Sequence, residues 1–172
     1  MNSDSPTPTS IPTPNSFSAF GLSAPLIKAM DEMGFTQPTP IQEQALPLPL
    51  PPPHDFIGLA STGTGKTAAF GIPLIEKIDS SLKSTQGLVL SPTRELALQV
   101  ADQLQKLGKY KNIRVVTIYG GSSYRTQIEG VKRGAHIVVA TPGRLVDFLE
   151  QKVVQLKDVQ TLILDEADEM LR

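Results

Sequence analysis

The chain has 172 residues, with 16 basic and 17 acidic side chains and a formal net charge of −1 at pH 7. The length fits one domain, and the balanced charge leaves any binding of a polyanion to a local patch. The sequence contains no cysteine, which excludes disulfides and thiolate zinc sites and fits a cytoplasmic location. No apolar run approaches the roughly 20 residues that span a bilayer, so we expect no membrane association.

The first part of the chain predicts a tail and two short helices. Residues 1–16 are mainly Ser, Thr, Pro and Asn, so we expect a disordered tail there. Ser23 can cap a first helix, which Gly34 would end. Thr39 can cap a second helix, with Gln42 three residues later as in a capping box. The alternating prolines that follow, up to residue 53, predict an extended connector.

From residue 55 onward, strand-like apolar runs alternate with helix-like segments. The strand-like runs occupy 55–60, 87–90, 113–119, 136–140 and 161–164. The helix-like segments occupy 66–78, 94–107, 124–132 and 144–151. Because the runs consist almost wholly of Val, Ile and Leu, we expect them to be buried on both faces. The alternation predicts an α/β fold, with a parallel sheet covered by helices on both faces.

A phosphate-binding loop lies between the first strand-like run and the first long helix. It reads Ser61, Thr62, Gly63, Thr64, Gly65, Lys66 and Thr67. Its glycines allow a tight turn whose N–H groups point inward, and the helix N-terminus adds partial positive charge. Lys66 would reach the β- and γ-phosphates of a nucleotide, and Thr67 would bind Mg²⁺. Ala60 stands where the general pattern has its first glycine. The alternative is a glycine-rich turn with an exposed lysine.

Two carboxylates follow the last strand-like run. Asp165 could hold Mg²⁺ through water, and Glu166 could orient or deprotonate an attacking water. An acidic cluster of this kind, taken alone, is more typical of a solvated segment. The phosphate loop upstream favours a shared nucleotide site, in which Lys66, Asp165 and Glu166 would be the catalytic residues.

Six segments occur in a fixed order, namely Gly34–Gln42, Ala60–Thr67, Pro92–Ala97, Gly120–Gly121, Thr141–Arg144 and Asp165–Asp168. Together they resemble the motifs of the DEAD-box RNA helicases, and the residues around Asp165–Asp168 are similar to those of the bacterial cold-shock-type members. The resemblance covers about residues 17–172. It implies a RecA-like P-loop domain, an ATP-dependent hydrolase activity that remodels RNA, and ATP with Mg²⁺ at the site.

The resemblance also assigns residues to the adenine side of that site. It implies that Gln42 reads the adenine edge, with Phe35 against the ring and Gln37 beside it. Phe17 matches the family's upstream aromatic at the adenine. The alternatives are a capping role for Gln42, which both ends of one amide could combine with adenine reading, and a core position for Phe35.

Three loops would contact RNA by the same resemblance, and each follows a strand-like run. Their residues are Pro92, Thr93 and Arg94, then Gly121 with Gly120, then Thr141, Pro142, Gly143 and Arg144. These residue types suit contacts to phosphate and sugar, so binding would be largely independent of sequence and sensitive to salt. The alternative is that the two threonines are only helix caps.

The resemblance predicts a division into a Q-motif segment, 17–46, and a first helicase domain, 47–172. The family's next motif, a Ser-Ala-Thr segment, and its second RecA-like domain do not occur in these residues. In the family the Ser-Ala-Thr strand lies between the phosphate-loop strand and the acidic-motif strand. We therefore expect a gap in the sheet and low stability of the 172 residues alone.

The sequence thus favours an ATP-dependent RNA helicase represented by part of its first domain. A nucleotide- or RNA-binding fragment without helicase activity is the main alternative. A P-loop kinase would need an acceptor pocket, and a DNA helicase would not need the Gln42 segment.

Overall fold

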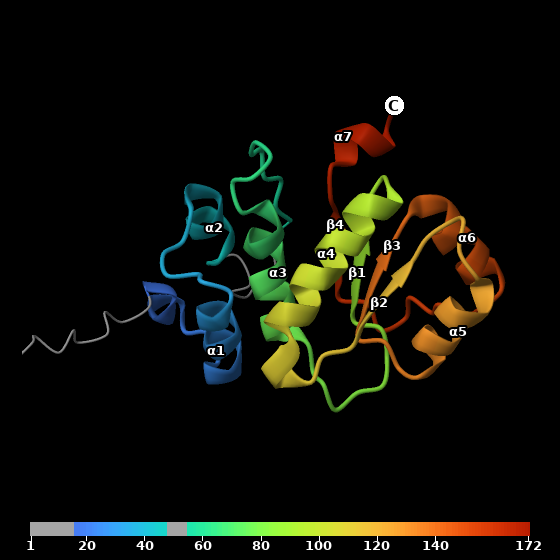
Figure 1. Ribbon diagram of the computed structural model, residues 1–172, viewed down its shortest axis with the longest axis horizontal. Coiled ribbons are helices and arrows are strands. Elements are labelled where there is room, and N and C mark those ends of the chain that lie inside the picture. The colour runs from blue at the N-terminus through green and yellow to red at the C-terminus, as the bar shows by residue number, and fades with distance from the viewer. Residues whose placement is uncertain (1–15, 48–54) are drawn as a thin grey trace, which may run out of the picture.

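The computed structural model describes residues 16–47 and 55–172, and a four-stranded parallel sheet forms its centre (Figure 1). The strand order is β2-β3-β1-β4. The strands are β1 (Gly87–Leu90), β2 (Val115–Ile118), β3 (Ile137–Ala140) and β4 (Thr161–Leu164). Gly87 of β1 is in register with Ile137 of β3 and with Thr161 of β4. The predicted tail, apart from Ser16, and most of the predicted connector lie outside the described residues.

Helices connect and cover the strands, close to the predicted bounds. They are η1 (Ser16–Phe20), α1 (Ala24–Glu32), α2 (Pro40–Ala45), α3 (Lys66–Lys77), α4 (Arg94–Leu107), η2 (Lys109–Lys111), α5 (Tyr124–Lys132), α6 (Pro142–Glu150) and α7 (Ala167–Met170). The Thr93 hydroxyl caps α4 by accepting from the Leu96 N–H at 3.3 Å. Ser23 precedes α1 as predicted, but its hydroxyl donates to Glu76 at 2.8 Å and ties α1 to α3.

Each face of the sheet packs against its own helices, because strand side chains alternate in direction. Val89, Ile137 and Val139 belong to a core cluster shared with α1, α3 and α4. Leu88 and Val138 belong to a second cluster with α5 and α6, which lie on the other side of the sheet from α1 and α3 (Figure 1). The predicted α/β fold, with a parallel sheet and helices on both faces, is confirmed.

The first and last strand-like runs differ from the prediction. Residues 55–60 form no strand, and the Leu59 side chain is 92% exposed. In β4, Leu162 and Leu164 are exposed while Ile163 packs against the core. A strand exists only where a neighbour pairs with its backbone. Among the described residues, no strand lies beside 55–60, and β4 pairs with β1 alone.

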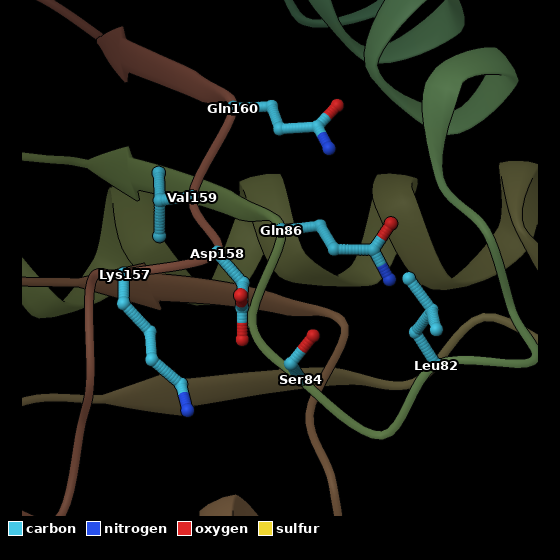
Figure 2. Close-up of a pocket in the computed structure, with 7 residues that line it drawn as sticks. All are labelled: Leu82, Ser84, Gln86, Lys157, Asp158, Val159 and Gln160. Carbon is cyan, nitrogen blue, oxygen red and sulfur yellow. The ribbon is translucent and has the colours of Figure 1, made fainter.

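The amino ends of the strands carry a small cavity of about 190 Å³ between the starts of β1 and β4 (Figure 2). Gln86 lines it, but the Gln86 amide already bonds the backbone N–H and carbonyl of Asp79, at 2.9 and 2.8 Å. Beside it, His136 is fully buried and accepts the Arg114 N–H at Nδ1 over 2.9 Å. Burial, together with the Arg114 charge, lowers the pKa of His136. These groups therefore close the amino end of the sheet by internal contacts.

No helix in the described ranges is long and apolar enough to cross a membrane.

Candidate nucleotide site and nucleic-acid interface

The phosphate loop turns sharply at Gly65 and leads directly into α3. Gly63 and Gly65 have φ of +79° and +84°, in the left-handed region that glycine adopts without strain. Thr64 Oγ1 donates to the Ser61 carbonyl at 2.6 Å and closes the turn. Because the first N–H groups of a helix have no partner within it, this turn presents donors and partial positive charge to an anion.

Gln42 joins the second helix to the phosphate loop. Its Oε1 accepts the Thr39 N–H at 3.0 Å, and its Nε2 donates to the Gly65 carbonyl at 3.2 Å. The side chain is 2% exposed, and a Cβ built on Gly65 would lie 2.4 Å from its Nε2. The predicted capping contact of Gln42 is therefore present. The amide also fixes the loop at Gly65, a contact that the sequence did not predict.

The other three residues predicted at the adenine range from fully buried to exposed. Phe17 is fully buried in the core, with its ring 6.4 Å from that of Phe20. Phe35 is half-buried against the same core, and Gln37 is exposed. The structure therefore brings Gln42 to the phosphate loop and leaves Gln37 open to solvent, whereas Phe17 is a core residue.

Asp165 and Lys66 come from segments about a hundred residues apart, and in the fold the Lys66 charge acts on the Asp165 carboxyl. The Asp165 N–H donates to the Leu90 carbonyl at 2.9 Å, which places the carboxylate just past the end of β4. Burial raises the pKa of Asp165, the Glu166 charge raises it further, and the Lys66 charge opposes both. Glu166 has φ of +50° and begins α7. A carboxylate held partly out of water beside a cation is typical of functional sites.

The oxygen ligands at this edge fit a hard divalent cation. Thr67 offers a hydroxyl at the start of α3, and Asp165 offers a carboxylate beside Lys66. Among the described residues, no group of three or more His, Cys, Asp or Glu side chains could hold a metal on its own. A cation here would therefore complete its shell with phosphate oxygens and water, as Mg²⁺ usually does.

The three loops predicted to contact nucleic acid follow β1, β2 and β3 at the same edge of the sheet. The Arg94 guanidinium stands 4.8 Å above the ring of Tyr119, so the first loop contacts the second. Gly121 has φ of +75° and no atom within 4 Å of a Cβ built on it. Pro142 and Gly143 are exposed at the start of α6. The edge thus presents open backbone at two loops and a guanidinium at the third.

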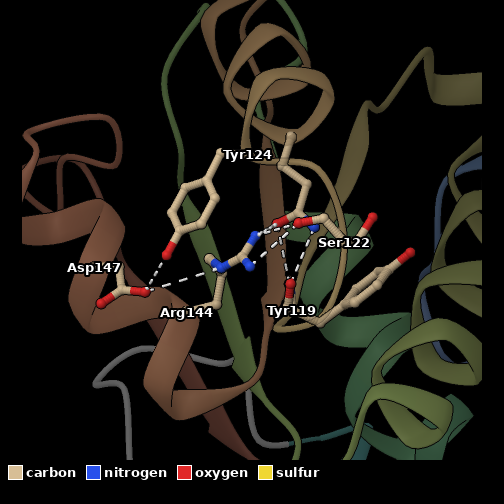
Figure 3. A network of polar contacts seen from close by, with 6 residues as sticks. Tyr119, Ser122, Tyr124, Arg144 and Asp147 are labelled. Carbon is tan, nitrogen blue, oxygen red and sulfur yellow. Dashed lines mark hydrogen bonds and ion pairs between the residues drawn. The ribbon is translucent and has the colours of Figure 1, made fainter.

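Arg144, predicted to contact RNA, instead points inward (Figure 3). Its side chain is 6% exposed. Its Nη1 and Nη2 donate to the Ser122 carbonyl at 3.2 and 3.3 Å, and Nη1 donates to Gln127 Oε1 at 3.3 Å. The guanidinium lies 3.8 Å from the ring centre of Tyr124. Both terminal nitrogens of the guanidinium are therefore directed at protein acceptors, and little of the side chain is exposed to a ligand.

Sequence reasoning missed Gln127, although one signal could have found it. Gln127 lies four residues before Val131 on α5, and both are buried. A glutamine on the apolar face of a helix needs internal hydrogen-bond partners. The pattern would have indicated a buried polar contact, but not which loop provides it.

Comparison with known proteins gives one consistent match. The family model for DEAD/DEAH box helicases matches residues 39–172. The DEAD-box ATP-dependent RNA helicase CshA of Bacillus cereus is 50% identical over 155 residues, and that of Streptococcus pneumoniae is 52% identical. Each alignment covers 90% of this chain, which spans only 29% of the length of either relative.

Solved structures of similar proteins agree with the fold. A DEAD box protein from Methanococcus jannaschii superposes with a TM-score of 0.85 at 43% identity, covering 90% of this chain and 42% of that one. Dbp5 of S. cerevisiae, bound to RNA and ADP BeF3, gives a TM-score of 0.83 at 38% identity, covering 91% of this chain and 39% of that one.

Proposed function

The chain belongs to the DEAD/DEAH box helicase family, and from this premise we propose that it supplies ATP- and RNA-binding surfaces of an ATP-dependent RNA helicase. Its fold is the RecA-like α/β fold of the family's structures. The observation that carries the proposal is the phosphate loop at the start of α3, with left-handed Gly63 and Gly65 and with the Gly65 carbonyl held by Gln42.

At the nucleotide, each group has a distinct task in the proposed mechanism. The N–H groups of the phosphate loop bind phosphate oxygens, and Lys66 neutralises charge on the β- and γ-phosphates. Thr67 and Asp165 hold Mg²⁺, which would neutralise further phosphate charge when bound. Glu166 orients the attacking water and accepts its proton. Gln42 reads the adenine, with Phe35 and Gln37 beside it. Phe17, buried in the core cluster, would pack at the adenine side of the site.

At the nucleic acid, the open backbone of Gly121, Pro142 and Gly143 suits sugar and phosphate contacts. Thr93 and Thr141 add hydroxyls, and Arg94 adds a charge. Such contacts carry no base information, so binding is independent of sequence. The Dbp5 structure with RNA and ADP BeF3 supports this reading, because that protein shares the fold at 38% identity.

The proposal includes the domain division predicted from the sequence. Residues 17–46 would form the Q-motif segment, and residues 47–172 would form part of the first helicase domain. A second RecA-like domain, in the same protein or supplied separately, would be the partner that completes the ATP site. The predicted cytoplasmic location remains a prediction.

Binding and hydrolysis by the 172-residue chain test the proposal. A fluorescent ATP analogue with Mg²⁺ should bind, and Lys66→Ala should weaken it about 100-fold, because a charge-assisted contact is lost. Lys77→Ala, at the other end of α3, is the matched control and should bind like the wild type. Equal affinity of the Lys66 variant and the wild type would overturn the nucleotide assignment.

The same preparation separates the alternatives for activity. ATP hydrolysis stimulated by single-stranded RNA identifies a working enzyme. Binding of both ligands without hydrolysis identifies a binding fragment. Equal stimulation by DNA and RNA would contradict an RNA helicase.

A further inference from the structure

We propose that Gln127 is a positioning residue that joins the three loops at the carboxyl edge of β1, β2 and β3, and that Arg144 acts with it from inside the protein. The identity of the ligand as RNA rests on the proposed function. The joining of the loops rests on the contacts alone.

Gln127 holds the end of β2 by both ends of its amide. Its Oε1 accepts the Tyr119 N–H at 3.1 Å, and its Nε2 donates to the Tyr119 carbonyl at 3.1 Å. The side chain is 6% exposed. These two bonds fix the backbone directly before Gly120 and Gly121, so the exposed turn leaves the sheet in one direction.

Arg144 connects the same turn to the loop after β3. Its guanidinium binds the Ser122 carbonyl beyond the glycines and also Gln127 Oε1. Gln127 therefore holds the near side of the turn, Arg144 holds the far side, and the two contact each other. Because Arg144 follows Thr141–Gly143 on α6, movement of either loop would break these bonds.

Aromatic rings extend the connection in two directions. Tyr119, held by Gln127, lies below the Arg94 guanidinium of the loop after β1. On the other side, Tyr124 lies against Arg144 and donates from its hydroxyl to Asp147 Oδ2 at 2.7 Å (Figure 3). Asp147 Oδ2 is also 4.0 Å from Arg144 Nε, so the buried cation has a carboxylate nearby. All three loops are linked through one buried pair.

Loops fixed before binding lose less conformational entropy when a ligand arrives. The inward Arg144 has a second consequence. Each phosphate neutralised by a cationic side chain adds about 0.7 to the salt slope for a single strand. Arg94 is exposed and can contribute such a charge, whereas the buried Arg144 should contribute little. Removing a positioning residue should therefore lower the affinity without changing the salt slope, whereas removing a residue that contacts phosphate should lower both.

The test measures binding of a fluorescent single-stranded RNA to the 172-residue chain across a salt series. Gln127→Leu and Arg144→Met should each weaken binding about tenfold with an unchanged salt slope. Arg94→Met should weaken binding and lower the slope by about 0.7. Gln105→Leu is the matched control, because Gln105 also donates to the β2 backbone, to Val115, but away from the loops. A lower slope for Arg144→Met would overturn its inward role.

A second measurement does not need RNA. Amide hydrogen exchange should rise at Tyr119, whose N–H donates to Gln127, and at Thr141, whose N–H donates to the Ile118 carbonyl, so that both loops report the loss in Gln127→Leu. Exchange in α3 and the affinity for nucleotide should stay unchanged. Unchanged exchange at both loops would overturn the proposal. If wild-type chain fails to bind RNA, the proposed function fails, and the exchange result still decides whether Gln127 joins the loops.

Gln127→Glu covers the case in which the leucine variant does not fold. It keeps the oxygen that accepts from Tyr119 and Arg144 but loses the donor to the Tyr119 carbonyl. Its carboxylate would face the Tyr119 carbonyl without a donor, so exchange should rise at Tyr119 and less at Thr141. No rise at Tyr119 would again overturn the proposal.

Discussion

The carboxyl edge of the sheet has two halves that are held together very differently. The half after β1, β2 and β3 has its loops joined by buried hydrogen bonds of Gln127 and Arg144. The half beside the phosphate loop includes residues 55–60, which form no strand and are exposed up to Leu59, and β4, whose Leu162 and Leu164 face solvent.

The two halves of this edge, which we propose bind different ligands, therefore differ in how firmly their loops are held before binding. The first half needs little ordering before it binds a strand of nucleic acid, because its loops already have partners. The second half has fewer buried contacts among the described residues, because β4 pairs with β1 alone and residues 55–59 are exposed. Local stability follows buried contacts, so opening should be easier in the second half.

The largest expected effect is on the free energy of unfolding, and it compares one aromatic ring from each half. Phe148→Ala on α6 removes a fully buried ring that lies 5.8 Å from Tyr124, and should cost about 3–5 kcal/mol. Phe56→Ala removes a ring that is 44% exposed, and should cost less than about 1 kcal/mol. Urea denaturation measures both. Similar losses for the two variants would break the contrast.

A smaller effect separates two glycines that share a backbone conformation. Gly65→Ala and Gly121→Ala should each cost about 1–2 kcal/mol, because both glycines are left-handed. Only Gly65 has Gln42 Nε2 2.4 Å from the added Cβ. Displacing that amide should cost about 1 kcal/mol more and weaken nucleotide binding. Thermal unfolding with nucleotide titration checks both, and equal results for the pair would contradict the role of Gln42.

The smallest effect concerns the charge of Asp165 and its dependence on pH. Because the pKa of Asp165 is raised in the fold, the native state binds more protons than the unfolded state between 3.8 and the raised value. Stability is therefore lost as pH rises through that window. Asp165→Asn should raise the melting temperature slightly at pH 7, with no difference from wild type below pH 3.8.

The same substitution should remove Mg²⁺-dependent binding of nucleotide. Asp158→Asn, an exposed carboxyl at the amino end of the sheet, is the control and should change stability by less than about 0.5 kcal/mol. A lower melting temperature for Asp165→Asn at pH 7 would show that the carboxylate stabilises the fold.

Local patterns were enough to predict most of the fold. The alternation of runs gave the parallel sheet, and Thr39 with Gln42 gave the start of α2, because these features depend on neighbours in sequence. The run at 55–60 was a wrong strand prediction. Its residues have strand character, but strand formation depends on a neighbour that the local sequence does not contain.

The candidate site was predictable in its residue types and less so in its contacts. Lys66 and Asp165 were assigned to one site through known roles, and this assignment stays a prediction; in the fold the Lys66 charge acts on the Asp165 carboxyl. The family resemblance assigned Arg144 to RNA, whereas its burial depends on Ser122 and Gln127 in another connection. Phe17 likewise shows its core position only after η1 has packed.

The outer edge of β4 also determines how the chain should behave in concentrated solution. Among the described residues it pairs with no second strand, and Leu162 and Leu164 lie exposed on one of its faces. Unpaired backbone groups next to apolar side chains are a template for another strand. The chain on its own should therefore lose monomer as concentration rises, and a charge at Leu162 should delay that association more than the same charge at Val146 on α6.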